Sequence, residues 1–320
     1  MDDAVEVMKR VLGRWGLQGK CPRMELSILG SPERALGREV MEDVHGELFV
    51  VERLPLASRA EREKQAMTLQ GLANAGLSQV HPWLSPAPGE FGVVESGCFW
   101  QLRRWEPGVA LPRDSYAQDA WRGVAAAHFL LALRQAAEKR PDLPGNGGRV
   151  FTLGHYIGHL MEHFQRMLPA LVKDMAPMVR ELQEYFQYEE ETPGRFCHGD
   201  FHPGNVVWGE EVVKAVIDWE FCGRKPPAYD MANLLGCLGM DDPAFLTGPM
   251  AMEFLRTLQE AEFLGPRDSH FLPDQIAALR FAWMREWVAR KDMAMITQEL
   301  DFLWLILDNR DLLRKKWTLR

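Results

Sequence analysis

The sequence lacks the cysteine pattern of a disulfide-stabilised or zinc-binding protein. Its five cysteines are an odd number, they are widely spaced, and none forms a CxxC pair or has the spacing from histidine that a zinc site needs. We therefore expect five reduced thiols, as is typical of a cytoplasmic protein.

Long apolar runs and an excess of positive charge are also missing. The longest conspicuous apolar stretch, Phe302 to Leu307, is far shorter than the ~20 residues that span a bilayer. No apolar signal segment follows the acidic start, Met1-Asp2-Asp3. Lysine and arginine number 37 against 45 aspartate and glutamate, a net charge of -8. The sequence thus predicts an intracellular protein with no nucleic acid and no membrane as partner, and it leaves the oligomeric state open.

The first hundred residues have the pattern of a small antiparallel sheet. Apolar residues at spacings of three and four predict a first helix over 4–17, and a second helix is expected over 58–75. Alternation and turn residues predict strands at Met24–Leu29, Leu36–Val44, Leu48–Val51, Phe91–Glu95 and Phe99–Arg103.

After Gly108 the pattern becomes helical, with one exception. Helical periodicity covers 116–137, 155–168, 172–188, 250–264 and 274–320. The exception is a predicted β-hairpin, formed by 206–208 and 212–217. The length of 320 residues fits two domains, which we place at 1–104 (β-rich) and 105–320 (helical).

The chemistry is concentrated on both sides of this hairpin. Cys197-His-Gly-Asp-Phe-His-Pro-Gly-Asn205 precedes it and Ile217-Asp-Trp-Glu220 follows it. Asn205 and Asp218 offer the oxygen ligands that Mg²⁺ prefers, and a separate carboxylate at Asp200 can accept a proton from a hydroxyl. These are the groups that phosphoryl transfer requires.

The spacing His198-x-Asp200-x-x-x-x-Asn205, with Asp218 after it, is that of the kinase catalytic loop and its second metal-binding aspartate. In its detailed form, the segment resembles the aminoglycoside phosphotransferase and choline kinase family of small-molecule kinases. The resemblance implies an α+β, bilobal protein-kinase-like fold, with a small antiparallel β lobe and a larger helical lobe, that uses ATP and Mg²⁺.

The same resemblance implies a role for each residue of the segment. Asp200 would orient or deprotonate the acceptor hydroxyl, Asn205 and Asp218 would hold Mg²⁺, and His198 would brace the loop. Asp230 matches a later aspartate that opens the next helix and would act as a cap and anchor. For His202 a structural role is weighed against a ligand contact. For Glu220 a metal or acceptor contact and a solvated charge stay equally open.

Two features favour a small acceptor over a protein. Asp218 lies only twelve residues before Asp230, which leaves no room for the activation segment of a protein kinase. Gly199 takes the place of the arginine that pairs with a phosphorylated segment in protein kinases. The acceptor itself is not indicated, because residues 221–320 are nearly neutral, with 13 basic against 14 acidic residues.

The nucleotide-binding half departs from the family pattern. Gly30 and Ser31 lie where the phosphate-covering turn is expected, but the third strand has Glu52 where the family has a phosphate-binding lysine. Since a carboxylate cannot bind a polyphosphate, we hypothesise an inverted pair, in which Lys64 or else Arg62 supplies the cation and Glu52 orients it. Arg53 points to the other face of the strand.

The connection between the lobes is expected at 101–108, and Arg103 and Trp105 within it complete the set of candidate nucleotide-binding residues. The tryptophan-containing stripe of the helix over 276–291 is expected to be core. The sequence therefore predicts a kinase that phosphorylates a hydroxyl of a small molecule such as an amino sugar, an amino alcohol or a related metabolite or antibiotic. The alternative is a catalytically degenerate nucleotide-binding scaffold, with spore-coat or envelope association as one form of it.

Overall fold

A computed structural model describes residues 2–26, 28 and 35–317 of the chain. By its contacts the chain divides into two compact units. The sheet unit comprises 1–110, 135–147 and 204–220, and the helical unit comprises 111–134, 148–203 and 221–320. The predicted hairpin thus groups with the sheet unit, whereas we expected it within the helical part. The two-domain division at residue 104 stays a prediction.

The sheet unit is built on a five-stranded antiparallel sheet in the order β1-β2-β3-β5-β4. Its strands are β1 (Gly19–Pro22), β2 (Gly37–Asp43), β3 (Leu48–Pro55), β4 (Val93–Glu95) and β5 (Cys98–Arg104). Helix α1 (Asp2–Gly13) covers one face, where Met8, Val11 and Leu12 pack against an apolar cluster from the strands. This burial of apolar surface fixes which side chains of each strand face α1.

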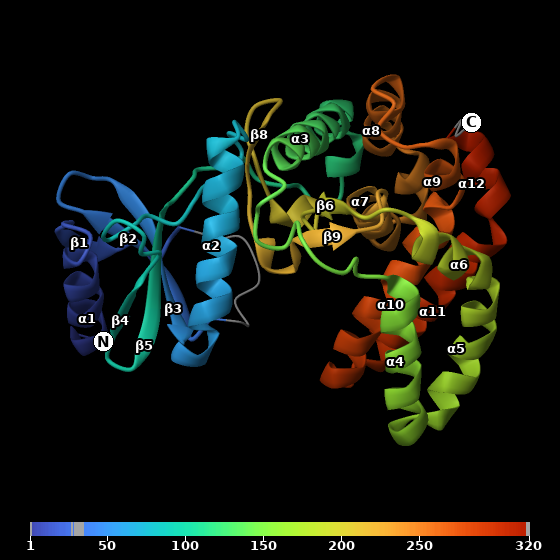
Figure 1. Cartoon of the computed structure of the whole chain (residues 1–320), viewed down its shortest axis with the longest axis horizontal. Coiled ribbons are helices and arrows are strands. Elements are labelled where there is room, and N and C mark those ends of the chain that lie inside the picture. Colours follow the sequence, from blue (N-terminus) through green and yellow to red (C-terminus); the bar gives the residue numbers. More distant parts are fainter. Residues whose placement is uncertain (1, 27, 29–34, 318–320) are drawn as a thin grey trace. The chain divides into compact units, whose positions relative to one another are not determined.

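The opposite face of the sheet carries charged groups. Antiparallel partners share a face, and Arg38 lies opposite Glu52, which in turn lies opposite Gln101. Helix α2 (Arg59–Asn74) lies on this side (Figure 1), with the Arg59 guanidinium 5.7 Å from the Phe99 ring centre. The polar face therefore lies next to α2 within the same unit.

Most predicted strands of this sheet are confirmed, but the first is displaced. The strand expected at Met24–Leu29 is wrong, because residues 24–26 form a turn and Met24 is exposed. The edge strand β1 lies earlier and is tied to β2 by a Lys20–Glu42 ion pair of 2.8 Å. Residues 27 and 29 lie outside the described part.

The other elements of the sheet unit include the hairpin β7 (Val206–Trp208) and β8 (Val213–Val216), which confirms the prediction. The helical unit contains a short pair, β6 (Arg195–Cys197) with β9 (Gly223–Lys225). Its helices are α3 (Ala120–Lys139, shared with the sheet unit from residue 135), α4 (Leu153–Met167), α5 (Pro169–Glu181), α6 (Gln183–Glu191), α7 (Tyr229–Asp241), α8 (Pro249–Glu260), α9 (Pro266–His270), α10 (Leu272–Arg290), α11 (Met293–Asp308) and α12 (Arg310–Lys316).

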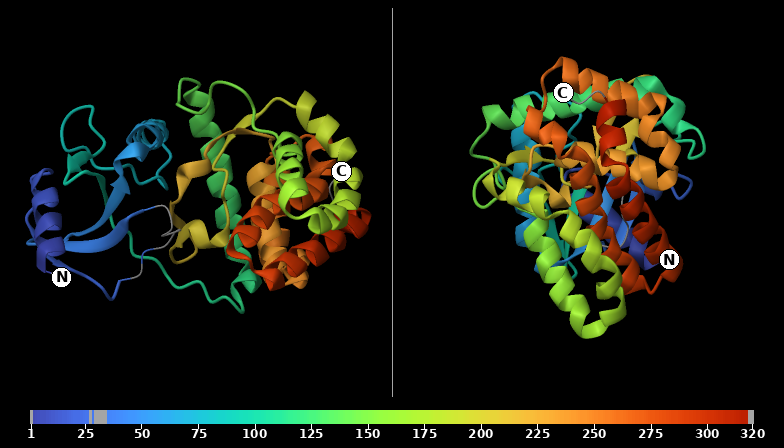
Figure 2. Two further views of the ribbon diagram at one scale, coloured as in Figure 1. Left: turned by 90° about the horizontal axis from the view of Figure 1, so that it is seen from below. Right: turned by 90° about the vertical axis from the view of Figure 1, so that its right-hand side faces the viewer.

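Helix α10 is the centre of the helical unit, since it packs against α4, α7 and α11 (Figure 2). The predicted combination of a small antiparallel sheet and a helical remainder is confirmed. All five cysteines are free thiols, as expected. None of the helices in the described part of the chain is both long and apolar enough to cross a bilayer.

Candidate active site

The loop that carries Asp200 is anchored from behind by Asp230. This loop begins where β6 ends, and Asp230 lies in the first turn of α7. The backbone N–H groups of His198 and Gly199 donate to the two oxygens of the Asp230 carboxylate at 2.7 and 2.8 Å. The anchoring role predicted for Asp230 thus has a specific form: one carboxylate fixes two consecutive peptide groups of the loop.

The backbone conformation and the space at position 199 exclude an arginine directly before Asp200. Gly199 has φ +86°, and a Cβ atom at this position would lie 2.2 Å from the Phe221 carbonyl oxygen and 2.6 Å from Cε of Lys225. The first of these neighbours is backbone and cannot move aside. Only glycine therefore allows the loop to pass this close to the turn that precedes β9.

We expect Gly199→Ala to unfold well below the wild-type temperature and to lose activity, because both the backbone conformation and the space oppose a methyl group. Gly158→Ala is the matched control, since Gly158 lies on α4 with no atom near its missing Cβ. That change should stabilise by roughly 0.5–1 kcal/mol. Thermal unfolding of both variants is the measurement, and equal unfolding temperatures would refute the steric argument.

His198 braces the loop internally. Its side chain is fully buried, and Nδ1 accepts a hydrogen bond of 3.2 Å from the backbone N–H of Asp200. Asn233 Nδ2 of α7 approaches Oδ1 of Asp200 to 3.4 Å. The Asp200 side chain is nevertheless 23% exposed. Its carboxylate is thus positioned by its surroundings and still accessible to a substrate.

Burial raises the pKa of Asp230 to about 6, although the two backbone N–H groups and Lys225 act in the opposite direction. A carboxyl whose pKa is higher in the folded state binds its proton more tightly there. Its contribution to stability is therefore present at low pH and is lost as the pH rises through about 6. Asp230→Asn removes this titration.

Between pH 5 and pH 8 the wild type should accordingly lose about 1 kcal/mol of unfolding free energy relative to Asp230→Asn. Denaturant unfolding of both proteins at the two pH values measures this difference. A difference that is independent of pH would contradict the assignment.

Asn205 and Asp218 lie on adjoining ends of the hairpin in the sheet unit. The backbone N–H of Ile217 donates to the carbonyl oxygen of Asn205 at 3.0 Å, so the segments that carry them are joined directly. Asp218 has φ +62°, in the left-handed region that aspartate tolerates better than most residues other than glycine. The turn places the Asp218 carboxylate next to Arg38, with Oδ1 3.8 Å from Nη2.

The partner expected for Glu52 is wrong. Instead of Lys64, it is Arg38 on the neighbouring strand that pairs with Glu52, with Nε 2.8 Å from Oε1. Lys64 is exposed on α2, and Arg62 is bound to Glu220 with Nη2 2.5 Å from Oε1. Glu220 thus pairs with Arg62, and this contact is neither a metal or acceptor contact nor the solvated charge that the sequence left open.

A second arginine lies near the same charges. Burial lowers the pKa of the Arg103 guanidinium, Glu52 and Asp218 act against this effect, and Arg38 adds to it. We call Arg38, Glu52, Arg103 and Asp218 the Glu52 cluster. It brings two guanidinium groups to the polar face of the sheet, next to the aspartate predicted to hold the metal.

The other nucleotide-binding candidates are placed as follows. Gly30 and Ser31 lie outside the described residues. Trp105 directly follows β5, and its backbone N–H donates to Leu48 O at 2.9 Å. Arg38 was missed by the sequence reasoning. Its pairing with Glu52 follows from the register of β2 against β3, which spacing along the chain does not reveal.

Tryptophans of α10 lie near the catalytic loop. His202 approaches Asp200 to 3.8 Å and meets the Trp283 ring edge-on at 6.5 Å between ring centres. Trp283 stacks on Trp287 at 6.1 Å, and Trp287 Nε1 donates to Glu299 at 3.0 Å. Both tryptophans are only half-buried, so they are less deeply buried than the core stripe we expected.

Comparison with known proteins identifies the family of this chain. The model of the Phosphotransferase enzyme family (APH) matches residues 39–283, which is most of the chain. The chain therefore belongs to this phosphotransferase family, as the resemblance in the sequence indicated.

Among curated proteins, a homoserine kinase of Phenylobacterium zucineum is 28% identical over 164 residues. The match covers 49% of this chain and 48% of that relative, so it spans less than half of the relative's length. Among solved structures, the amicoumacin kinase hAmiN, in complex with AMP-PNP and Ca²⁺, has a TM-score of 0.66 at 16% identity, covering 97% of this chain and 96% of that one.

A choline/ethanolamine kinase family protein from Mesorhizobium loti has a TM-score of 0.63 at 16% identity, covering 99% of this chain and 98% of that one. Likeness at this level of identity concerns the fold. The predicted α+β, protein-kinase-like fold is thereby confirmed.

Proposed function

We propose that this protein transfers the γ-phosphoryl group of ATP to a hydroxyl of a small molecule, in a reaction that requires Mg²⁺. The observation that carries the proposal is the anchored loop, in which Asp230 and His198 fix the backbone around an accessible Asp200 carboxylate. Such positioning is the main protein contribution to phosphoryl transfer.

Asp200 acts on the acceptor. The hydroxyl oxygen forms a bond to the γ-phosphorus while the bond from that phosphorus to the bridging oxygen breaks and ADP leaves. The hydroxyl proton passes to the Asp200 carboxylate, which Asn233 holds in place. The products are ADP and a phosphate monoester, and the proton is later released to water.

The donor set of Asn205 and Asp218 fits a magnesium ion, since an amide and a carboxylate oxygen are hard ligands. They would hold the ion because the Ile217–Asn205 hydrogen bond keeps the two segments together. When bound, Mg²⁺ neutralises phosphate charge and orients the γ-phosphoryl group. Among the similar structures, the amicoumacin kinase is in complex with AMP-PNP and Ca²⁺, and an aminoglycoside phosphotransferase is in complex with ADP.

Arg38 takes the role of the missing strand lysine. Its guanidinium lies between Glu52 and Asp218. In this role, the Glu52 carboxylate orients the guanidinium and the guanidinium binds the phosphates. Arg103 adds a second positive charge to the Glu52 cluster. One guanidinium group can donate two hydrogen bonds to phosphate oxygens, so an arginine can replace the lysine in phosphate binding.

A second function is favoured by the buried Glu52 itself. A carboxylate at the lysine position fits a degenerate nucleotide-binding scaffold, with spore-coat or envelope association as one form of it. Stabilisation by ATP with Mg²⁺, followed by ADP formation with homoserine, choline and amino sugars as acceptors, separates the two. Acceptor-dependent ADP formation supports the kinase, whereas binding without turnover on any acceptor supports the scaffold.

The acceptor class in this proposal is an amino sugar, an amino alcohol or a related metabolite, and a cytoplasmic location is part of the proposal. The similar proteins include homoserine, amicoumacin and choline or ethanolamine kinases, whose named substrates differ widely. The cytoplasmic location is consistent with five free thiols.

A further inference from the structure

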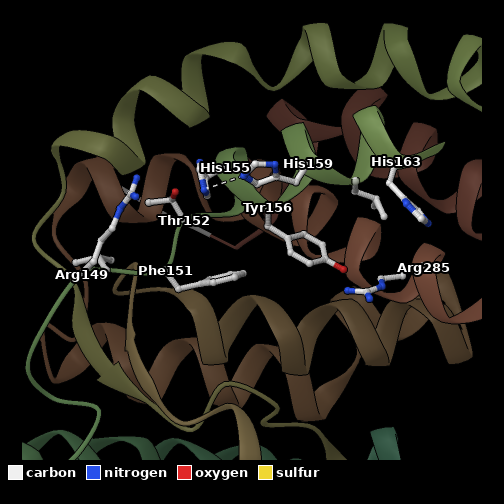
Figure 3. Close-up of a pocket in the computed structure, with 10 residues that line it drawn as sticks. Arg149, Phe151, Thr152, His155, Tyr156, His159, His163 and Arg285 are labelled. Carbon is white, nitrogen blue, oxygen red and sulfur yellow. Dashed lines mark hydrogen bonds between the residues drawn. The ribbon is translucent and has the colours of Figure 1, made fainter. Parts of the chain in front are cut away.

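The helical unit contains a cavity of about 530 Å³ beside α4. We call it the α4 cavity. Its ten lining residues come from the segment 149–152, from α4 and from α10, and they include Arg149, Phe151, His155, Tyr156 and Arg285. Figure 3 shows Arg149 and Arg285 at opposite ends of the lining residues, with the rings of Phe151 and Tyr156 between them.

The charges of this cavity are of one sign. Arg149 and Arg285 are permanently charged, and three histidines lie at successive turns of α4, two of which, His155 and His159, are hydrogen-bonded through their Nε2 atoms at 3.1 Å. Of the ten described residues that line it, none is acidic. Nearby carboxylates are Glu162, 3.7 Å from His159 Nδ1, and Glu190, 3.5 Å from Thr152 Oγ1, and neither lines the cavity.

Between the arginines the surface is aromatic. The ring centres of Phe151 and Tyr156 are 6.0 Å apart, and Lys225 Nζ lies 4.5 Å from the Phe151 ring centre. Burial raises the pKa of Tyr156, while the adjacent Arg285 acts against this effect. The phenol is therefore a neutral donor beside a cation, which is suited to an anionic oxygen.

The start of α4 does not account for anion binding in this cavity. The N–H groups of Leu153 and Gly154 already donate to the Glu189 carboxylate. A ligand in the cavity has to rely on the side chains of Arg149, Arg285 and Tyr156. Arg285 with Tyr156 at one end, and Arg149 at the other, would each hold a charged or polar group at an end of a molecule whose body packs on the rings between them.

We propose that the α4 cavity binds a small organic anion, a carboxylate or phosphate ester with a planar or apolar body. The cavity is linked to the catalytic loop by contacts within the helical unit. Phe151 N donates to Arg224 O at 3.0 Å, and Arg224 pairs with Phe196, two residues before His198. The ligand is either the acceptor itself or a separate effector of the same anionic chemistry. In the first case the inference rests on the proposed function, and the acceptor is an anionic metabolite and not an amino sugar or amino alcohol.

The test is calorimetric binding of phenyl phosphate, which combines a dianion with a ring, at pH 7.5 and 150 mM salt. Saturable binding to the wild type is expected. Arg285→Gln should weaken it about tenfold through the loss of a charge-assisted hydrogen bond, because Arg285 shares its end of the cavity with the Tyr156 phenol. Arg166→Gln is the control, because Arg166 is exposed on the last turn of the same helix and does not line the cavity.

A second probe, 4-(hydroxymethyl)benzoate, distinguishes the two sources. If the cavity holds the acceptor, this probe is phosphorylated by MgATP, and Arg285→Gln raises its KM about tenfold with little change in kcat. If the cavity holds an effector, the probe binds with the same dependence on Arg285 but is not phosphorylated. Either result supports the proposal.

Absence of saturable binding for both probes overturns the proposal, and so does an Arg285→Gln variant that binds as the wild type does. Binding is also measured in Asp200→Asn, whose fold is expected to be intact. If this variant binds the probe but does not turn over, anion binding is shown without catalysis. A failure of the anion site and a failure of the phosphotransferase proposal can therefore be told apart.

Discussion

Asp200→Asn should lower kcat by about three orders of magnitude, the range over which a positioned general base contributes. The amide keeps the shape of the side chain but cannot accept the hydroxyl proton. Nucleotide binding should change little, because the Glu52 cluster and Asn205 are untouched. Steady-state ADP formation with a working acceptor gives kcat, and thermal stabilisation by MgATP reports binding in the same variant.

The matched control for this prediction is Asp301→Asn, which makes the same chemical change at an exposed position of α11. It should retain wild-type kcat within a factor of about two, as a surface change away from the site should. If Asp200→Asn retained activity to the same extent, Asp200 would have no part in the proton transfer, and the anchored loop would need another explanation.

Arg38→Ala should raise the KM for ATP by roughly 10- to 100-fold, since a hydrogen bond to a charged group contributes about 1.5–3 kcal/mol. The same change leaves Glu52 buried without its cation, which can itself destabilise the protein. Arg38→Ala combined with Glu52→Gln removes both charges together. The double variant should therefore fold better than the single one while its KM for ATP stays high.

Lys64→Ala and Arg53→Ala are the controls, because Lys64 is exposed on α2 and Arg53 lies on the opposite face of β3, over Trp100. Both should bind ATP within about twofold of the wild type. A strong effect of Lys64→Ala, with none from Arg38→Ala, would restore the inverted pair suggested by the sequence and refute the role of Arg38 in phosphate binding.

The anchored loop was predictable because the residues that identify it lie close together in the sequence. His198, Asp200 and Asn205 lie within eight residues, and the hairpin that follows has clear strand and turn residues. Asp230 could be found because it matches the later aspartate of the family that the sequence resembles.

Pairings between distant segments were not predictable. Glu220 meets Arg62 across 158 positions of the chain, and β6 pairs with β9 although each strand has only three residues. The sequence favoured Lys64 over Arg62 as the cation, yet the helix turns Lys64 outward and buries Arg62. Arg38 could not be singled out in the same way, because its pairing with Glu52 depends on the register between two strands and not on spacing along the chain.

A crystal structure of the protein with AMP-PNP and Mg²⁺ tests the central claim most directly. The account predicts the ion on the side-chain oxygens of Asn205 and Asp218, the Arg38 guanidinium on a phosphate oxygen, and the γ-phosphoryl group facing Asp200. A nucleotide whose phosphates lie away from Asp218, with no ion on Asn205, would contradict it.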